Sequence, residues 1–270
     1  MMIDLSSSIL SSEDESLVDF QQAFTLAKQA YKQEINHILI IQNISGKANI
    51  ENYNQLVKNI KLFNNKLLEE KMEITIRPGI KLIYSDQLDK AFNFRVESLT
   101  INKASKYLLV EIPAVFNVSS LESFFYKLQI RGIVPIISNA EKVKTFQMQP
   151  EILYELVQKS GALIQISANN IFEGSDPLTS ETAKIIIQSR LVHLLASSAQ
   201  HPEMRPYRMT EGYTQIEKWT SPEYVEYLKQ NAHSVWFGHY FPIYQPLPFN
   251  KKPLNHLIKF KTLKRTSSRV

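Results

Sequence analysis

Short apolar runs alternate with amphipathic stretches along most of the chain. The apolar runs predict seven strands, at residues 1–5, 38–42, 73–77, 107–112, 134–138, 163–167 and 191–196. Between them, apolar positions recur with the period of a helix at residues 17–33, 50–71, 120–131, 150–159, 179–189 and 207–219. Strands that alternate with helices in this way predict an α/β protein with a parallel sheet.

One more helix is predicted after Ser221, because Ser221-Pro222-Glu223 supplies an N-cap, a first-turn proline and an acid at the helix N-terminus. This helix should end at about residue 231, and the regular fold near Gly238. Prolines then crowd the chain at positions 242, 246, 248 and 253, where they prevent a helix. We therefore predict one folded domain over residues 1–238, followed by a proline-rich linker and basic tail over residues 239–270.

The length of 270 residues fits a single α/β barrel, a fold that commonly reaches this size as one domain. A hydrophobic fraction of 44% is ordinary for a globular protein and excludes a disordered chain. Cysteine is absent, which excludes disulfides, thiol catalysis and cysteine-ligated metals and fits a reducing compartment. No signal peptide or membrane-spanning run is recognisable, so we expect a soluble, cytoplasmic protein.

The net charge of +5 originates at the C-terminal end of the chain. Residues 251–270 hold seven of the 31 cations and no acid, so residues 1–250 carry 24 cations against 26 acids. This balance argues against nucleic-acid binding by the folded domain. The basic tail is interpreted either as a solvated extension or as a segment that contacts anionic lipid at the inner face of the membrane, or an acidic partner.

Reacting groups of a β/α barrel gather where strands end and loops begin. In this chain, small neutral polar residues dominate those junctions. Three serines follow the first strand, Asn43 follows the second, and Asn139, Ser198 and Gln200 follow later ones. Neither GxGxxG nor GxxxxGK[ST] occurs, so nucleotide binding through those loops is unsupported.

Most polar residues at the junctions have a structural interpretation. Serines 6–8 are interpreted as loop, because a serine hydroxyl becomes a nucleophile only when a base is held beside it by a third group. His37 and His193 enter apolar strands as core residues, whereas His201 is the histidine at a junction where chemistry is expected. Asp4 is expected to anchor loops through hydrogen bonds.

Three cations, Lys81, Lys142 and Arg205, lie at or near these junctions. One interpretation is that they are solvated surface charges in ordinary salt bridges. The other is that they form a phosphate-binding cluster, because guanidinium forks match phosphate geometry. Such a cluster would bind a phosphorylated ligand without cleaving it.

Several motifs follow one another in a recognisable order: Met2-Ile3-Asp4, Pro78-Gly79, Leu109-Val110-Glu111-Ile112-Pro113, LQIRGIVPII at 128–137, LYELV at 153–157, and the segment from Leu191-Val192-His193 through Ala196-Ser197 to Arg205. Together they resemble the PHP (polymerase and histidinol phosphatase) superfamily, and within it the CpsB-type bacterial tyrosine phosphatases of capsule and exopolysaccharide loci. The resemblance covers residues 1–238. It implies a distorted (β/α)7 barrel with a tri-metal pocket, usually manganese-dependent, that hydrolyses phosphotyrosine on a partner tyrosine kinase.

The sequence departs from this family at seven metal-ligand positions. The resemblance places the two histidines of the opening M-I-D-x-H-x-H motif at Ser6 and Ser8, and further ligands at Asn43, Lys81 (with Ile80 the alternative), Asn139, Ser198 and Gln200. Acids remain at the family positions Asp14, Glu111 and Glu141, while Lys142 replaces an arginine and Arg205 is unchanged.

Neutral hydroxyls and amides are poor ligands for manganese, which needs several anionic or imidazole donors. An ammonium group such as that of Lys81 also repels a dication. The sequence therefore predicts no bound metal and a catalytically degenerate pseudo-phosphatase that acts as a binding or regulatory protein in capsule or exopolysaccharide synthesis. Its expected partner is a bacterial tyrosine kinase, the phosphotyrosine tail of that kinase, or an active paralogue.

The alternative is an active manganese-dependent protein-tyrosine phosphatase that dephosphorylates a bacterial tyrosine kinase. Its altered metal site would be built from Asp14, Glu111, Glu141 and His201. A purely structural subunit is a third hypothesis, which predicts a stable oligomer without metal or ligand.

Overall fold

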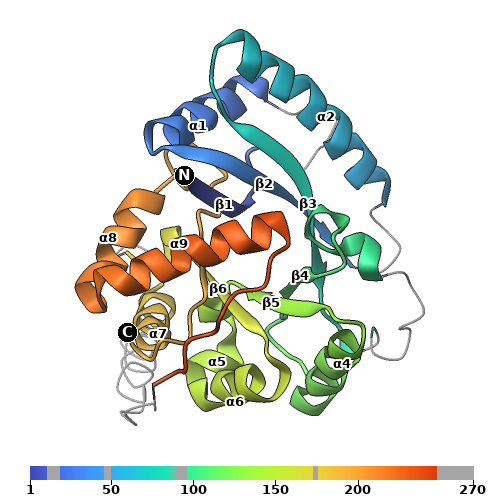
Figure 1. Cartoon of the computed structure of the whole chain (residues 1–270), viewed down its shortest axis with the longest axis vertical. Coiled ribbons are helices and arrows are strands. Elements are labelled where there is room, and N and C mark those ends of the chain that lie inside the picture. Colours follow the sequence, from blue (N-terminus) through green and yellow to red (C-terminus); the bar gives the residue numbers. More distant parts are fainter. Residues whose placement is uncertain (11–18, 46–49, 87, 89–95, 173–175, 248–270) are drawn as a thin grey trace, which may run out of the picture.

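The protein is an α/β barrel in a computed structural model that describes residues 1–10, 19–45, 50–86, 88, 96–172 and 176–247. All neighbouring strands of its seven-stranded sheet are parallel, and they follow the order of the sequence (Figure 1). The strands are β1 (Met2–Ser7), β2 (Ile35–Ile44), β3 (Thr75–Ile83), β4 (Tyr107–Glu111), β5 (Val134–Ser138), β6 (Leu163–Ser167) and β7 (Leu194–Ala196). Each predicted strand is present, and the predicted barrel class is confirmed.

The barrel is nearly closed, because β1 and β7 approach each other at their C-terminal ends. The backbone N–H of Ser198 donates to the Ser6 carbonyl at 2.9 Å, and the Ser8 N–H donates to the Ala199 carbonyl at 2.8 Å. These hydrogen bonds join the loops that follow the two terminal strands. The closure therefore brings the first and last junctions of the barrel together, at the end where function is expected.

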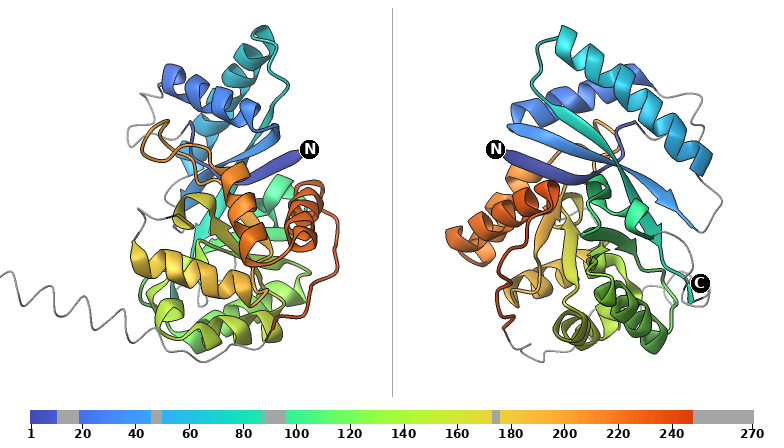
Figure 2. Two further views of the ribbon diagram at one scale, coloured as in Figure 1. Left: turned by 90° about the vertical axis from the view of Figure 1, so that its left-hand side faces the viewer. Right: turned by 45° about the vertical axis from the view of Figure 1, so that its right-hand side comes forward.

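The barrel interior is filled by alternate side chains of the strands and by α9 (Pro222–Phe237), which lies across the N-terminal end of the barrel (Figures 1 and 2). Val235 and Trp236 of α9 pack with interior residues such as Leu39 and Leu109. This packing explains why α9 extends beyond the predicted end at residue 231. The helix ends where Gly238 adopts a left-handed conformation with φ of 70°.

Strand β3 continues past Pro78 and Gly79, where the sequence predicts a junction. Gly79 lies against the interior side chains of Leu39 and Ile41, and a Cβ at this position would lie 2.6 Å from the Leu39 Cγ. The glycine thus permits a close approach inside the barrel. Consequently Lys81 lies within the strand and is buried, rather than in a loop.

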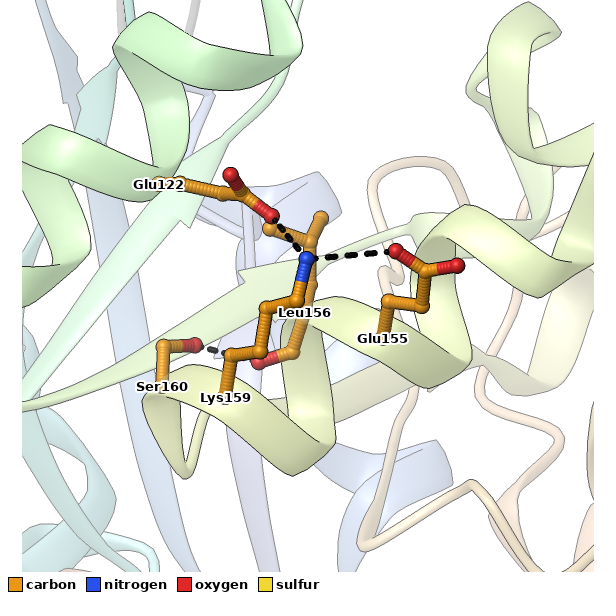
Figure 3. A network of polar contacts seen from close by, with 5 residues as sticks. All are labelled: Glu122, Glu155, Leu156, Lys159 and Ser160. Carbon is orange, nitrogen blue, oxygen red and sulfur yellow. Dashed lines mark hydrogen bonds and ion pairs between the residues drawn. The ribbon is translucent and has the colours of Figure 1, made fainter.

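The other helices lie outside the barrel (Figure 2). They are α1 (Phe20–Lys32), α2 (Ile50–Glu69), α4 (Val118–Ile130), α5 (Lys144–Met148), α6 (Pro150–Ser160), α7 (Pro177–Gln188) and α8 (Met209–Trp219). Helices α4 and α6 are joined at the surface by Lys159, whose Nζ lies 3.0 Å from Glu122 Oε1 and 3.3 Å from Glu155 Oε2 (Figure 3). These charges are largely exposed, so the pairs contribute little to stability.

Residues 239–247, which we call the strap, pack on the barrel instead of leaving it as a free linker. Figure 1 shows the strap, in red, running from the end of α9 past β5 and β6 toward α7. The Tyr107 hydroxyl donates to the His239 carbonyl at 2.7 Å, and the Leu247 N–H donates to the Ser189 carbonyl at 2.8 Å.

No helix in the described part of the chain combines the length and apolar character needed to cross a bilayer.

Candidate functional site

A polar layer closes the apolar interior at the C-terminal end of the barrel. Side chains alternate along a strand, so the residue two positions after an interior residue faces the same way. This rule places Lys81 above Gly79, Glu111 above Leu109, and Ser138 above Ile136. Asn43 pairs with Lys81 in the sheet register, and Gln165 pairs with Ser138.

Lys81 and Glu111 form an ion pair in this layer. The Lys81 side chain is 9% exposed and that of Glu111 is 38% exposed, so the pair lies at the boundary between the core and solvent. Next to it, the Ser138 hydroxyl donates to Gln165 Oε1 at 3.1 Å. An ammonium group thus occupies the surroundings of the carboxylate that would otherwise be available to a cation.

Asp4 organises the junction between β1 and β7. Its fully buried carboxylate accepts hydrogen bonds from the Ser6 and Ser197 N–H groups at 3.2 and 2.9 Å, and from the Ser197 hydroxyl. The Tyr207 hydroxyl adds a contact to Ser7 Oγ at 2.9 Å. Burial raises the pKa of Asp4 to about 6, against the opposing effect of these hydrogen bonds. Asp4 therefore anchors loops, as predicted.

Asn139 and Ser198 come from neighbouring loops and adopt strained backbone conformations. Their φ angles are 52° and 49°, in the left-handed region that non-glycine residues seldom occupy. The Ser198 hydroxyl donates to Asn139 Oδ1 at 3.4 Å. Both residues are partly buried, and both stand where the family resemblance places metal ligands. Strain of this kind persists only where the surrounding structure holds it.

Glu141 is enclosed in the protein behind these loops. One carboxylate oxygen accepts from the Ser167 N–H at 3.0 Å and from Asn170 Nδ2 at 2.7 Å, while Oε2 is buried without a hydrogen-bond partner. Burial raises the pKa of Glu141, although the hydrogen bonds from Asn170 and Ser167 partly oppose that effect. Glu141 therefore ties together the loops that follow β5 and β6.

A cavity of about 460 Å³ opens beside the ends of β5, β6 and β7. Three cations, Lys142, Arg205 and Arg208, line it together with the acids Asp176 and Glu203. The Arg205 Nε donates to the Ser198 carbonyl at 3.4 Å, which connects the cavity to the strained loop. The remaining lining residues are Asn169, Asn170, Phe172, Thr179, Met204 and Pro206.

The structure separates the cations that the sequence groups together. Lys142 and Arg205 line the same cavity, whereas Lys81 is engaged by Glu111 on β4 and is not among the residues that line it. His201 pairs with Arg205 as an isolated bridge, and its Nδ1 accepts the backbone N–H groups of residues 203 and 204.

The other predicted pocket residues surround the barrel mouth in different environments. Ser6 is buried, Ser8 is partly buried, and Asn43 and Gln200 are exposed. Asp14 lies outside the described residues.

Arg208 and Phe172 were missed by the sequence interpretation, although both line the cavity. The Arg208 guanidinium stacks on the Phe172 ring, with Cζ 3.7 Å from the ring centroid. Asn169 closes the nearby loops, since its Nδ2 donates to the carbonyls of Ser197 and Pro206 at 3.0 and 2.8 Å. Asn169 and Phe172 lie in the loop that directly follows β6. Because functional residues of a β/α barrel gather in such loops, this position was a signal in the sequence that could have identified them as candidates.

The described residues do not fit a cluster of divalent cations. Within the ranges that the structure covers, no three histidine or acidic side chains come together in a way that holds a metal ion. Glu111 is neutralised by Lys81, and Glu141 is enclosed with one oxygen committed to two donors. The neutral oxygens and amides at the family ligand positions supply no anionic replacement.

Comparison with known proteins identifies the family. The family model described as "Capsular polysaccharide synthesis, CpsB/CapC" matches residues 2–236. The chain is 25% identical over 231 residues to the tyrosine-protein phosphatase YwqE of Bacillus subtilis, covering 86% of this chain and 90% of YwqE. It is 22% identical over 247 residues to the tyrosine-protein phosphatase CpsB of Streptococcus agalactiae, covering 88% of this chain and all of CpsB.

A solved structure gives the same picture of the fold. It comes from work on YwqE of Bacillus subtilis and CpsB of Streptococcus pneumoniae, described there as metal-dependent tyrosine phosphatases. The TM-score is 0.79 at 23% identity, and the match covers 93% of this chain and 100% of that chain. The family match over nearly the whole folded domain, together with the shared barrel, means that this chain belongs to the CpsB/CapC family of capsular polysaccharide synthesis.

Proposed function

We propose that this protein binds a phosphorylated tyrosine in the cavity beside β5–β7 and does not hydrolyse it. The observation that carries the proposal is the meeting of Lys142, Arg205 and Arg208 in one cavity with the Phe172 ring. Guanidinium groups bind phosphate oxygens through paired, charge-assisted hydrogen bonds. A phenyl side chain next to them offers an apolar surface for a tyrosyl ring.

The charged side chains that line the cavity favour an anionic ligand, but one that carries only a small negative charge. Three cations stand against Asp176 and Glu203. Asp176 is already engaged as the N-cap of α7, where it accepts from the Thr179 N–H at 3.2 Å. Part of its charge is thus directed at the helix N-terminus. A single phosphate group matches the remaining positive charge better than a polyanion does.

Hydrolysis requires a water molecule that is activated by a metal ion or a general base. Among the described residues, neither a metal site nor a free histidine base is found in the cavity. Metal-bound water is the usual source in metal-dependent hydrolases, and the described donors do not fit that arrangement. His201 is committed through Nδ1 to a local turn. These features support binding in preference to turnover.

An active metal-dependent tyrosine phosphatase is the second candidate function, and the names of the relatives favour it. YwqE and CpsB are both named tyrosine-protein phosphatases, and nothing in their names suggests loss of activity. In this alternative, manganese would be bound by Glu111, Glu141 and His201 with Asp14, which lies outside the described residues. Binding of a cation would first have to displace Lys81 from Glu111.

Metal content and turnover separate the two candidates. The full-length protein is purified after manganese supplementation, analysed for bound metal, and assayed with a phosphotyrosyl peptide. The binding function predicts no stoichiometric manganese and no phosphate release above that of the Glu111→Gln variant. Stoichiometric manganese, with turnover that Glu111→Gln abolishes, would establish the phosphatase instead.

The family match supports a role in capsule or exopolysaccharide synthesis. We propose that the ligand is the phosphotyrosine tail of a bacterial tyrosine kinase in the cytoplasm. Binding would protect this tail from an active paralogous phosphatase, or the protein would form a complex with that paralogue. Co-purification with the phosphorylated kinase but not with its dephosphorylated form is the expected result. Equal recovery of both kinase forms would contradict this choice of partner.

A further inference from the structure

Large hydrophobic side chains are unusually concentrated on the surface around the strap. Of the fifteen such side chains that are exposed in the described chain, five fall between residues 237 and 247. They form what we call the strap surface: Phe237, Tyr240, Ile243, Tyr244 and Leu247. Exposed apolar side chains scattered singly need no explanation, but five within an eleven-residue surface segment favour an interaction site.

The backbone beneath this surface is held in place by several contacts. Lys106 Nζ donates to the Gly238 carbonyl at 2.9 Å and lies over the Tyr240 ring, 3.4 Å from its centroid. Phe241 stacks on Tyr107, with the ring centroids 6.3 Å apart. The strap is therefore attached near the start of β4, at the N-terminal end of the barrel.

A stack of side chains fixes the other half of the strap. Tyr244 lies parallel to Tyr227, with ring centroids 4.0 Å apart, and its N–H donates to the Tyr227 hydroxyl at 3.3 Å. Tyr227 in turn stacks on Tyr224, and the Arg190 guanidinium lies over the Tyr224 ring, 4.5 Å from its centroid. The exposed side chains are thus presented on an ordered backbone, which lowers the entropy lost on binding.

The charge pattern of the following sequence indicates what covers this surface. Residues 239–247 contain no lysine, arginine, aspartate or glutamate, and the first cation after them is Lys251. From that point to residue 270 the chain has seven cations and no acid. Aromatic side chains favour the boundary between lipid and water, and clustered lysines next to such a surface favour anionic lipid headgroups.

We propose that the strap surface docks the protein on an anionic lipid bilayer, with the basic tail strengthening the attachment. Lys106 contacts the first half of the strap directly, and Arg190 is connected to Tyr244 through the stacked rings of Tyr224 and Tyr227, so both add positive charge to this part of the molecule. The strap lies at the N-terminal end of the barrel, and the cavity lined by Arg205 lies at the opposite end. A docked molecule therefore presents that cavity away from the bilayer.

The test is sedimentation of the full-length protein with lipid vesicles. Vesicles of phosphatidylcholine alone are compared with vesicles that also contain phosphatidylglycerol, at about 0.1 M salt, where charges close to the surface still interact. We expect binding to the anionic vesicles to be at least about tenfold stronger than binding to the neutral ones. No binding to anionic vesicles would overturn the proposal.

Two variants separate the strap surface from the tail. We expect Tyr240→Ser combined with Ile243→Ser, and separately removal of residues 251–270, to weaken binding to anionic vesicles about tenfold each. The matched control combines Leu68→Ser with Val115→Ser, which are 77% and 88% exposed elsewhere on the molecule and should leave binding unchanged. Circular dichroism verifies that each variant is folded.

Two outcomes would contradict docking through the strap. Binding that disappears with the tail but survives the Tyr240 and Ile243 substitutions would assign the attachment to the tail alone. Binding to an acidic polypeptide such as polyglutamate, without binding to anionic vesicles, would identify a protein partner in place of the bilayer.

Discussion

Lys81 and Glu111 form an ion pair inside the C-terminal end of the barrel. The two residues come from neighbouring strands, β3 and β4, and both follow interior positions filled by Gly79 and Leu109. The lysine supplies a fixed positive charge at a mouth where the family resemblance implies bound dications. The pair thus neutralises the Glu111 carboxylate within the protein.

The first prediction concerns the stability of this pair. Lys81→Met leaves Glu111 without its partner, and a partly buried carboxylate without a counter-charge should lower the free energy of unfolding by about 1–3 kcal/mol. The expected cost is below that of a fully buried pair because Glu111 is partly solvated. Urea denaturation at neutral pH measures it. Adding Glu111→Gln should restore part of the loss.

Lys159 provides the matched control, because it also pairs with two carboxylates but stands in solvent (Figure 3). Lys159→Met should leave the denaturation midpoint unchanged within error, since its partners Glu122 and Glu155 remain hydrated. A Lys81→Met variant that is as stable as the Lys159→Met variant would show that the ion pair between Lys81 and Glu111 does not contribute to the stability of the protein.

Asp4 gives a prediction about pH. Its pKa is about 6 in the folded protein and 3.8 as an unperturbed group, so the folded state holds the proton more tightly. The contribution of Asp4 to stability is therefore present below pH 4 and is lost as the pH rises to about 6. Relative to the Asp4→Asn variant, the wild type should lose about 3 kcal/mol across this range. Parallel stability curves for the two proteins would contradict the assignment.

His193 should produce the opposite dependence on pH. It is fully buried, its Nδ1 accepts the Ile164 N–H at 3.0 Å, and burial lowers its pKa to about 3 from 6.5. The unfolded chain therefore takes up the proton first, and stability is lost as the pH falls from 6.5 toward 3. Relative to His193→Gln, the wild type should lose about 5 kcal/mol over the full range down to pH 3, of which about 3 kcal/mol is lost between pH 7 and pH 4. Denaturation curves at pH 7 and pH 4 measure the difference in free energy of unfolding between the two proteins. A difference that is the same at both pH values would contradict this prediction.

Gly79 tests the packing beneath the polar layer. An added Cβ would lie 2.6 Å from Leu39 Cγ and 2.9 Å from Ile41 Cδ1, both inside the barrel. Gly79→Ala should therefore destabilise the protein by about 1–3 kcal/mol through overpacking. Thermal denaturation measures the effect. A variant with unchanged stability would mean that the barrel interior adjusts freely around this strand.

The sequence was sufficient for the strand order but not for every boundary. Strand β3 was predicted to end at Arg77, before Pro78, a residue that is uncommon inside a central strand. The structure shows why it is tolerated: β2 pairs along β3 from His37 onward, but pairing of β3 with β4 begins only at Lys81. Pro78 thus lies where β3 has a neighbour on one side.

The candidate site was predicted in part. Lys142 and Arg205 follow β5 and β7, which are close in the sheet order, so their meeting in one cavity was accessible from the sequence. Lys81 was assigned to the same cluster, but it lies inside strand β3 rather than in the loop that follows it, and Glu111 on the neighbouring strand β4 engages it. Phe172 was missed because loops between elements carry no periodic pattern that places their side chains. Arg208 was missed because the predicted helix at 207–219 includes it, whereas in the structure it precedes α8 as its N-cap.

The central claim is that the cavity lined by Lys142, Arg205 and Arg208 binds phosphotyrosine. Isothermal titration calorimetry of the full-length protein with a phosphotyrosyl peptide tests it directly, with the unphosphorylated peptide as reference. We expect binding only to the phosphorylated peptide, weakened at least about tenfold by Arg205→Ala, which removes a charge-assisted contact to phosphate. The same substitution at Arg131, which pairs with Glu97 on another surface, should have no effect. Absence of heat with the phosphorylated peptide, or an affinity that Arg205→Ala leaves unchanged, would contradict the claim.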